Sequence, residues 1–153
     1  MTITKASGDH LRPARATALR LPRYTGTVRR SGVYGIDLFC GAGGLTFGLQ
    51  KAGVSIVAGV DSDPTSEFPF TCNNRSKFIQ ADVRELSGSD LSHLYPSGAI
   101  RLLAGCAPCR PFSPHRRGSI DPDHEEWALV KEFGRLTAEL RPELVVCVTQ
   151  NAH

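Results

Sequence analysis

The sequence predicts an α/β fold with a doubly wound, mostly parallel sheet. Short apolar runs alternate with amphipathic stretches between residues 33 and 149, and several of these runs close on an aspartate or a glycine, as at Asp61 and Gly105. Strands that alternate with helices in this order form parallel sheets. Ligands of such sheets bind beyond the carboxyl ends of the strands, which makes the residues there candidate site residues.

The first half of the folded region predicts two strands, each followed by a helix. Residues 32–40, GVYGIDLFC, form a short apolar run that ends in an acid and a turn, which is typical of a buried strand. Residues 45–53 predict a helix because apolar residues recur at helical spacing and a glycine closes the segment. Residues 54–61 predict the second strand, and residues 64–74 predict a weaker helix that Pro69 interrupts.

The second half continues the alternation with three more strands and one clear helix. Residues 78–83 predict a short strand that ends near Asp82, residues 100–105 a fourth strand and residues 143–149 a fifth. A long helix is expected from Asp123, its N-cap, to about residue 140. The apolar stripe of that helix consists of Trp127, Val130, Phe133, Leu136 and Leu140.

The net charge of +3 is distributed unevenly along the chain. Residues 1–32 contain seven basic residues and one acid, Asp9, without helical or strand periodicity. We therefore expect a disordered basic tail over residues 1–32, followed by one folded domain over residues 33–153. The tail suits contact with DNA phosphates, an organellar transit peptide or a solvated segment without a partner. No membrane span or secretory signal is recognisable, so we expect a cytoplasmic protein.

The cysteine pattern does not indicate a disulfide framework, because the count is odd and the secretory context is missing. Cys106 and Cys109 form a CxxC pair. A structural zinc site would need a second such pair, and a redox CxxC normally opens a helix, whereas prolines follow here. We therefore expect no metal, and a redox protein remains a less favoured reading. The five cysteines are Cys40, Cys72, Cys106, Cys109 and Cys147.

Polar and glycine residues follow the expected strands and are predicted to meet at one edge of the sheet. Gly41, Gly43 and Gly44 lie between a strand and a helix, where they let the backbone approach a ligand. Their spacing is not the dinucleotide pattern GxGxxG. Asp61 is placed to accept hydrogen bonds from ribose hydroxyls and Asp82 from an adenine amino group. Either acid could equally cap a helix, but together they suggest a nucleoside-containing cofactor without a pyrophosphate.

Two stretches resemble the motifs of one enzyme family. DLFCGAGGLTFGL (residues 37–49) resembles the cofactor loop, and GCAPCRPFS (residues 105–113) the catalytic loop, of the DNA cytosine-C5 methyltransferases. GVDSDP and ADVREL stand between them and match two intermediate cofactor motifs. The resemblance covers about residues 33–148. It implies a Rossmann-like, S-adenosylmethionine-dependent methyltransferase fold.

By this resemblance, Cys109 matches the nucleophile that attacks C6 of a cytosine, so that C5 takes the methyl group from S-adenosyl-L-methionine. The substrate implied is double-stranded DNA with the target cytosine flipped out of the helix. The neighbouring prolines would hold the thiol in place, and nearby arginines could lower its pKa and contact phosphate. The residues assigned to loop support and DNA contact are Pro108, Arg110, Ser113, Arg116 and Arg117.

The resemblance also assigns the cofactor contacts. Asp61 matches the acidic ribose ligand, where the family more often has glutamate, and Asp82 with Val83 matches the adenine contact. Arg110 departs from the family's usual glutamine beside the nucleophile. The full set of implied cofactor residues is Phe39, Gly41, Gly43, Gly44, Leu45, Asp61, Asp82 and Val83.

The end of the sequence departs further from the family pattern. Where the family has a Glu-Asn-Val triplet after a strand, this chain has Gln150 and Asn151, and later motifs and the target-recognition region are absent. We therefore expect a truncated product or one half of a split enzyme with a separate C-terminal partner. The alternatives are a catalytically silent S-adenosylmethionine-binding half, a tRNA cytosine-C5 methyltransferase and, less favoured, the CxxC redox protein.

Overall fold

The structure, a computed structural model, describes residues 32–107 and 125–148 of the chain. The expected basic tail lies outside these residues, and so do Asp123, Gln150 and Asn151. The division into a tail and a folded domain therefore stays a prediction. No helix in the described ranges is both long and apolar enough to cross a membrane.

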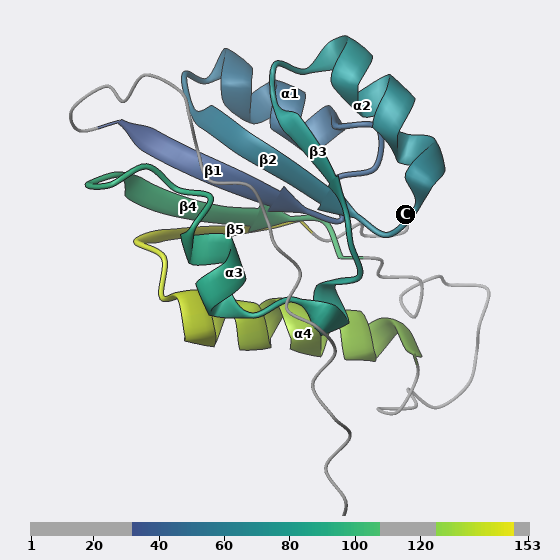
Figure 1. Cartoon of the computed structure of the whole chain (residues 1–153), viewed down its shortest axis with the longest axis vertical. Helices are drawn as coiled ribbons and strands as arrows, with labels where there is room; N and C mark the ends of the chain where they lie inside the picture. The colour runs from purple at the N-terminus through teal and green to yellow at the C-terminus, as the bar shows by residue number, and fades with distance from the viewer. Residues whose placement is uncertain (1–31, 108–124, 149–153) are drawn as a thin grey trace, which may run out of the picture.

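Five parallel strands form a single sheet in the order β3-β2-β1-β4-β5 (Figure 1). The chain starts in the middle of this sheet, moves outward through β2 and β3, and returns through β4 to β5 on the other side. The reversal beside β1 makes the sheet doubly wound, which confirms the predicted fold class. The strands are β1 (Val33–Leu38), β2 (Ser55–Asp61), β3 (Lys77–Gln80), β4 (Ile100–Gly105) and β5 (Leu144–Cys147).

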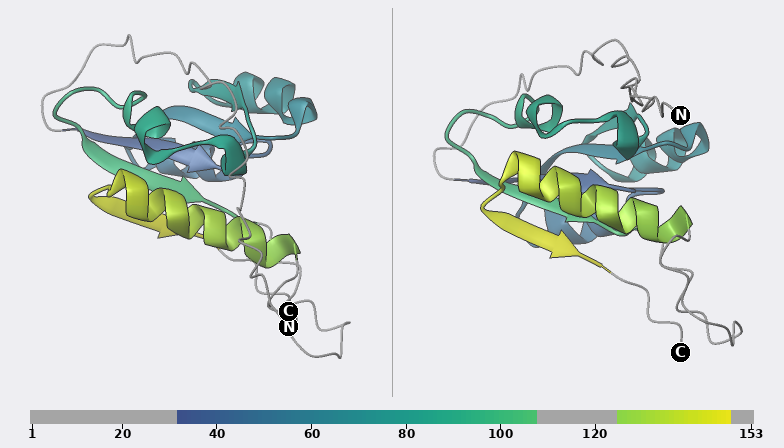
Figure 2. Two further views of the ribbon diagram at one scale, coloured as in Figure 1. Left: turned by 60° about the horizontal axis from the view of Figure 1, so that its bottom comes forward. Right: turned by 90° about the horizontal axis from the view of Figure 1, so that it is seen from below.

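Helices cover both faces of the sheet (Figures 1 and 2). One face carries α1 (Gly44–Lys51), the short 3-10 helix η1 (Pro64–Ser66) and α2 (Glu67–Asn73). The opposite face carries α4 (Glu125–Leu140) beside α3 (Gly88–Ser92) and η2 (Val83–Glu85). The glycine-rich turn after β1 therefore opens α1 at the carboxyl ends of the strands, as predicted.

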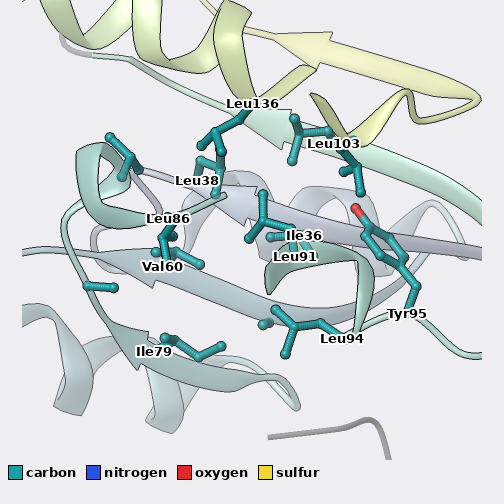
Figure 3. Packing of buried hydrophobic residues seen from close by; sticks show 14 of the residues in the cluster. Ile36, Leu38, Val60, Ile79, Leu86, Leu91, Leu94, Tyr95, Leu103 and Leu136 are labelled. Carbon is teal, nitrogen blue, oxygen red and sulfur yellow. The ribbon is translucent and has the colours of Figure 1, made fainter. Parts of the chain in front are cut away.

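The main core lies between the sheet and the α3–α4 layer (Figure 3). Ile36, Leu103 and Leu136 are fully buried there, and they come from two neighbouring strands and from α4. Tyr95 reaches into the same core, and its hydroxyl donates to the backbone carbonyl of Leu102 at 2.7 Å. The predicted stripe of α4 is confirmed for Phe133, Leu136 and Leu140, each at most 5% exposed, whereas Val130 is half-buried and the side chain of Trp127 lies outside the description.

One local prediction needs correction, and one helix was not predicted. Pro69 does not interrupt a helix, because it is the third residue of α2, where the backbone N–H would have no partner within the helix anyway. Residues 84–99, to which the sequence analysis assigned no element, contain α3. A capping box between Ser87 and Asp90 starts α3, and this signal is short enough to resemble an ordinary polar loop.

Candidate functional site

The turn between β1 and α1 has an unusual backbone. Phe39 has φ +58°, Gly41 +49° and Gly43 +87°, so the chain enters the left-handed region three times in five residues. Two backbone hydrogen bonds fix the turn, from Cys40 N–H to the Val60 carbonyl at 3.1 Å and from Gly43 N–H to the Cys40 carbonyl at 2.8 Å. A bulky residue such as Phe39 adopts this conformation at a cost, and such strain is concentrated at functional sites.

The glycines of this turn serve different purposes. A Cβ on Gly43 would lie 2.1 Å from Nδ2 of Asn74 and 2.8 Å from the Phe70 ring, so this position is glycine because α2 packs against it. A Cβ on Gly41 or Gly44 would meet nothing within 4 Å. Open space therefore surrounds Gly41 and Gly44 where a side chain would stand, and the approach of a ligand to this backbone stays a prediction.

A buried carboxylate lies beneath the turn. Asp37 is 0% exposed, and its Oδ2 accepts a 2.7 Å hydrogen bond from the Thr46 hydroxyl in the first turn of α1. Its Oδ1 has no hydrogen-bond partner among the described residues. Burial, with a smaller contribution from the negative charge of Asp61, raises the pKa of Asp37 to about 6. Burial likewise raises the pKa of the neighbouring Cys40 thiol, so Cys40 stays protonated at neutral pH.

Asp61 is the last residue of β2, and its carboxylate is hydrogen-bonded to the turn between β1 and α1. Its Oδ2 accepts from the Gly41 N–H at 2.8 Å, and its Oδ1 accepts from the Asp63 N–H at 3.0 Å. A carboxylate offers about four acceptor sites, so about two remain open among the described contacts. Two open sites on one half-buried carboxylate suit a vicinal diol such as that of a ribose.

Asp82 follows β3 and is already occupied. It caps η2 by accepting from the Arg84 N–H at 2.9 Å, and it forms an ion pair with the Arg84 guanidinium, Nη2 to Oδ2, at 2.6 Å. Hydrogen bonding from the Arg84 side chain holds the pKa of Asp82 below its ordinary range. The predicted adenine contact is therefore both a helix cap and one half of an ion pair.

A cavity of about 220 Å³ brings these groups together. Four of the eight predicted cofactor residues line it: Phe39, Asp61, Asp82 and Val83. Gly41 lies one hydrogen bond away through Asp61, whereas Gly43, Gly44 and Leu45 are not in the cavity wall. The remaining lining residues are Ser62, Ala81, Arg84, Cys106 and Leu129.

Contacts from α4 support the far wall of this cavity. The guanidinium of Arg135 donates to the carbonyls of Val83 at 3.1 Å and Leu86 at 2.9 Å. Glu139 accepts from the Gly88 N–H at 2.8 Å. These bonds fix the segment that carries Val83 against a long helix, so the cavity wall is supported from two layers of the fold.

A larger recess of about 670 Å³ lies elsewhere, between the last turn of α1, the start of β2 and the end of α2. None of the predicted site residues lines it. Because it is at the amino end of β2, it is far from the strand ends where ligands of such sheets bind, and we do not assign the site to it.

The predicted nucleophile Cys109 lies outside the described residues, as do Pro108, Arg110, Ser113, Arg116 and Arg117. Their roles stay predictions. The described chain leads directly to them, because Cys106, just after β4, is part of the cavity wall and Ala107 is 2% exposed. The last described residues before Cys109 therefore lie at the edge of the cavity.

Sequence reasoning missed several residues that shape the site. Thr46 and Arg84 are partners of strand-end carboxylates, and only the strand-end position of Asp37 and Asp82 could have pointed to them. Leu129 comes from α4, on the other side of the sequence gap that follows Ala107, and no local pattern connects it to the glycine turn.

The described residues fit part of a nucleoside-type ligand. Phe39, Val83 and Leu129 supply apolar walls for a base, and Asp61 offers acceptors for a sugar. The volume lies below the roughly 300 Å³ at which small-molecule sites usually begin. The cavity therefore suits the nucleoside end of a larger ligand.

Comparisons with known proteins point in one direction. The profile of the family described as "C-5 cytosine-specific DNA methylase" matches residues 33–147. The chain is 42% identical over 110 residues to the Type II methylase M.HgiDII of Herpetosiphon aurantiacus, which covers 72% of this chain and 30% of that protein. It is 34% identical over 118 residues to the Type II methyltransferase M.XorII of Xanthomonas oryzae pv. oryzae, which covers 73% and 27%.

A solved structure shows the same relation. A crystal structure of an E. coli protein, described as a DNA modification methyltransferase encoded within a prophage, superposes with a TM-score of 0.64 at 28% sequence identity. The match covers 77% of this chain and 32% of that one. The chain thus spans about a third of the length of these relatives.

Proposed function

Because the chain belongs to the C-5 cytosine-specific DNA methylase family, we propose that it forms the cofactor-binding and nucleophile part of a DNA cytosine-C5 methyltransferase. The observation that supports this most is the cavity at the carboxyl ends of β2 and β3. It combines a carboxylate with open acceptor sites and apolar walls, where the family's cofactor motifs stand.

The cofactor proposed for this cavity is S-adenosyl-L-methionine, which supplies an electrophilic methyl group. Asp61 accepts the ribose hydroxyls while the Gly41 N–H holds its carboxylate in place. Phe39 and Val83 enclose the base. A Cβ on Gly41 would meet no atom within 4 Å, so this position is open beside the backbone. We propose that the rest of the ligand passes over the backbone there.

The proposed nucleophile is Cys109, whose thiolate adds to C6 of a cytosine in DNA. This addition would place electron density on C5, which would take the methyl group from the sulfonium and release S-adenosyl-L-homocysteine; loss of the C5 proton and expulsion of the thiolate would then restore the ring. The base must leave the duplex for the thiolate to reach it. Arg110, Arg116 and Arg117 are proposed to contact the phosphate backbone, and Pro108 and Ser113 to support the loop.

A second candidate function is that of a cofactor-binding part, which catalyses methyl transfer only when a separate partner supplies further residues. The length comparison favours it, because the matched region corresponds to 30% of the first relative and 27% of the second. This candidate shares the cofactor site with the first and differs in the need for a partner.

The cofactor site is tested by binding. Asp61→Asn replaces one acceptor oxygen by an amide that can no longer accept from both Gly41 and a ribose, so we expect at least tenfold weaker binding of S-adenosyl-L-homocysteine in calorimetry. Asp63→Asn is the matched control, since its exposed side chain caps η1 and does not line the cavity. Equal affinity of both variants would contradict the assignment of Asp61.

Catalysis is tested by transfer of labelled methyl groups to mixed-sequence DNA. Incorporation by the 153-residue chain, lost in Cys109→Ser and retained in Cys106→Ser, would support the methyltransferase reading with Cys109 as nucleophile. Absence of label from the chain alone, together with intact cofactor binding, would favour the second candidate. Label that survives Cys109→Ser would exclude Cys109 as the nucleophile.

A further inference from the structure

The carboxylate of Asp82 is held by three N–H groups of Arg84. Oδ1 accepts from the backbone N–H of Arg84 at 2.9 Å and from its Nε at 3.0 Å. Oδ2 accepts from the same Nε at 3.0 Å and from Nη2 at 2.6 Å. Nε carries one hydrogen, which both oxygens share, so three N–H groups occupy most of the roughly four lone-pair sites of this carboxylate.

Arg84 reaches this position from within the cavity wall. Its side chain is 54% exposed, and both it and Asp82 line the cavity. Asp61 is the other carboxylate in the same wall. It accepts two hydrogen bonds, from other residues, and leaves about two acceptor sites open. The two ends of the cavity therefore differ. At the proposed sugar end, Asp61 has open hydrogen-bond acceptor sites, whereas at the proposed base end Arg84 already donates to Asp82.

We propose that Arg84 is an internal competitor that sets affinity and base selectivity at the nucleobase end of this cavity. The inference rests on the proposed cofactor site and goes beyond it. A ligand whose base carries an exocyclic amino group competes with the guanidinium N–H groups for the oxygens of Asp82. The backbone N–H of Arg84 does not have to move, so η2 keeps its cap during the exchange.

The cost of this displacement is small, because the ion pair is largely exposed to solvent. Exposed pairs of this kind typically correspond to less than about a fivefold change in an equilibrium constant. The competition therefore tunes affinity and does not block binding. A base that carries an oxo group in place of the amino group is not subject to it, since that oxygen can accept directly from the guanidinium.

The test uses calorimetry on the full chain with two ligands, S-adenosyl-L-homocysteine and its 6-oxo counterpart S-inosyl-L-homocysteine. In Arg84→Ala we expect about two- to fivefold tighter binding of the adenosyl ligand and equal or weaker binding of the inosyl ligand. Arg75→Ala is the control, because this exposed arginine lines the other recess and is not expected to change either affinity.

Ionic strength supplies a second readout. Salt weakens the exposed Arg84–Asp82 pair, so the unsubstituted chain should bind the adenosyl ligand more tightly as salt rises, whereas Arg84→Ala should not respond. Unchanged or weaker adenosyl binding in Arg84→Ala would overturn the competition and leave the proposed function intact. An equal gain for both ligands would show that Arg84 only narrows the cavity. Failure of every variant to bind either ligand would overturn the cofactor site as well.

Discussion

At the scale of single residues, the site depends on three carboxylates at strand ends that have the same chemistry and different surroundings. Asp37 is buried with one oxygen bonded, Asp61 is half-buried with acceptor sites open, and Asp82 is paired with one arginine. Their environments differ accordingly: Asp37 fixes the first turn of α1, Asp61 is the proposed ribose acceptor, and Asp82 is bonded to Arg84.

The buried carboxylate makes stability depend on pH in an unusual direction. Burial raises the pKa of Asp37 from 3.8 to about 6, so the folded chain retains a proton that the unfolded chain releases between these values. The stabilisation from this proton is complete below about pH 4 and is lost as the pH rises through about 6. The full difference corresponds to about 3 kcal/mol.

Asp37→Asn removes this titration. In urea unfolding between pH 4 and pH 8, the unsubstituted chain should lose stability relative to the variant by up to about 3 kcal/mol as the pH rises. Asp63→Asn is the control: hydrogen bonds from Thr65 lower the pKa of Asp63, so its pH-dependent effect is lost only below about pH 4, and within this pH range its curve should run parallel to that of the unsubstituted chain. Parallel stability curves for the chain and Asp37→Asn would contradict the raised pKa.

Sequence patterns predicted which residues lie together in the cavity wall. They did not predict which hydrogen bonds each of these residues already makes. Asp61 and Asp82 were expected in one site because parallel strands end at one edge of the sheet, and both line the cavity. The ion pair between Arg84 and Asp82 depends on the conformation of a side chain two residues away, which periodicity does not encode. The role of Cys109 rests on the family resemblance and stays a prediction.

At the scale of elements, the glycine turn joins two helices as well as a strand. Gly43 is the N-cap of α1 and also packs against Phe70, a fully buried residue of α2, and Asn74 just after it. The position of α2 therefore constrains the turn that carries Phe39. Strand positions were predictable here because their apolar runs are long and clearly punctuated, whereas α3 depends on one capping box.

The packing of α2 against the glycine turn is tested by comparing two glycine substitutions. Gly43→Ala must accommodate both φ +87° and a Cβ that overlaps Asn74 and Phe70, and we expect it to lower the free energy of unfolding by about 2–4 kcal/mol. Gly41→Ala has φ +49° and open space around its Cβ, so about 1–2 kcal/mol is expected. Urea titrations measure both, and equal losses would show that α2 does not constrain the turn.

At the scale of the whole molecule, charge and the cavity are separated along the chain. Residues 1–32 carry seven basic residues and one acid, whereas residues 33–153 carry eleven basic and fourteen acidic ones. Every residue that lines the cavity lies between 39 and 129. We therefore expect that removal of residues 1–32 lowers the electrostatic attraction to a polyanion and leaves every residue of the cavity wall in place.

Deletion of residues 1–32 should weaken binding to DNA without changing the cavity. The deletion converts a net charge of +3 to −3, so we expect lower affinity for a mixed-sequence duplex and a shallower dependence of log affinity on log salt, because fewer counterions are released. Fluorescence anisotropy across a salt series measures both, and unchanged binding of S-adenosyl-L-homocysteine serves as the control for folding. If the salt dependence stays the same, the cations that contact DNA lie within residues 33–153, where Arg116 and Arg117 are the first to replace.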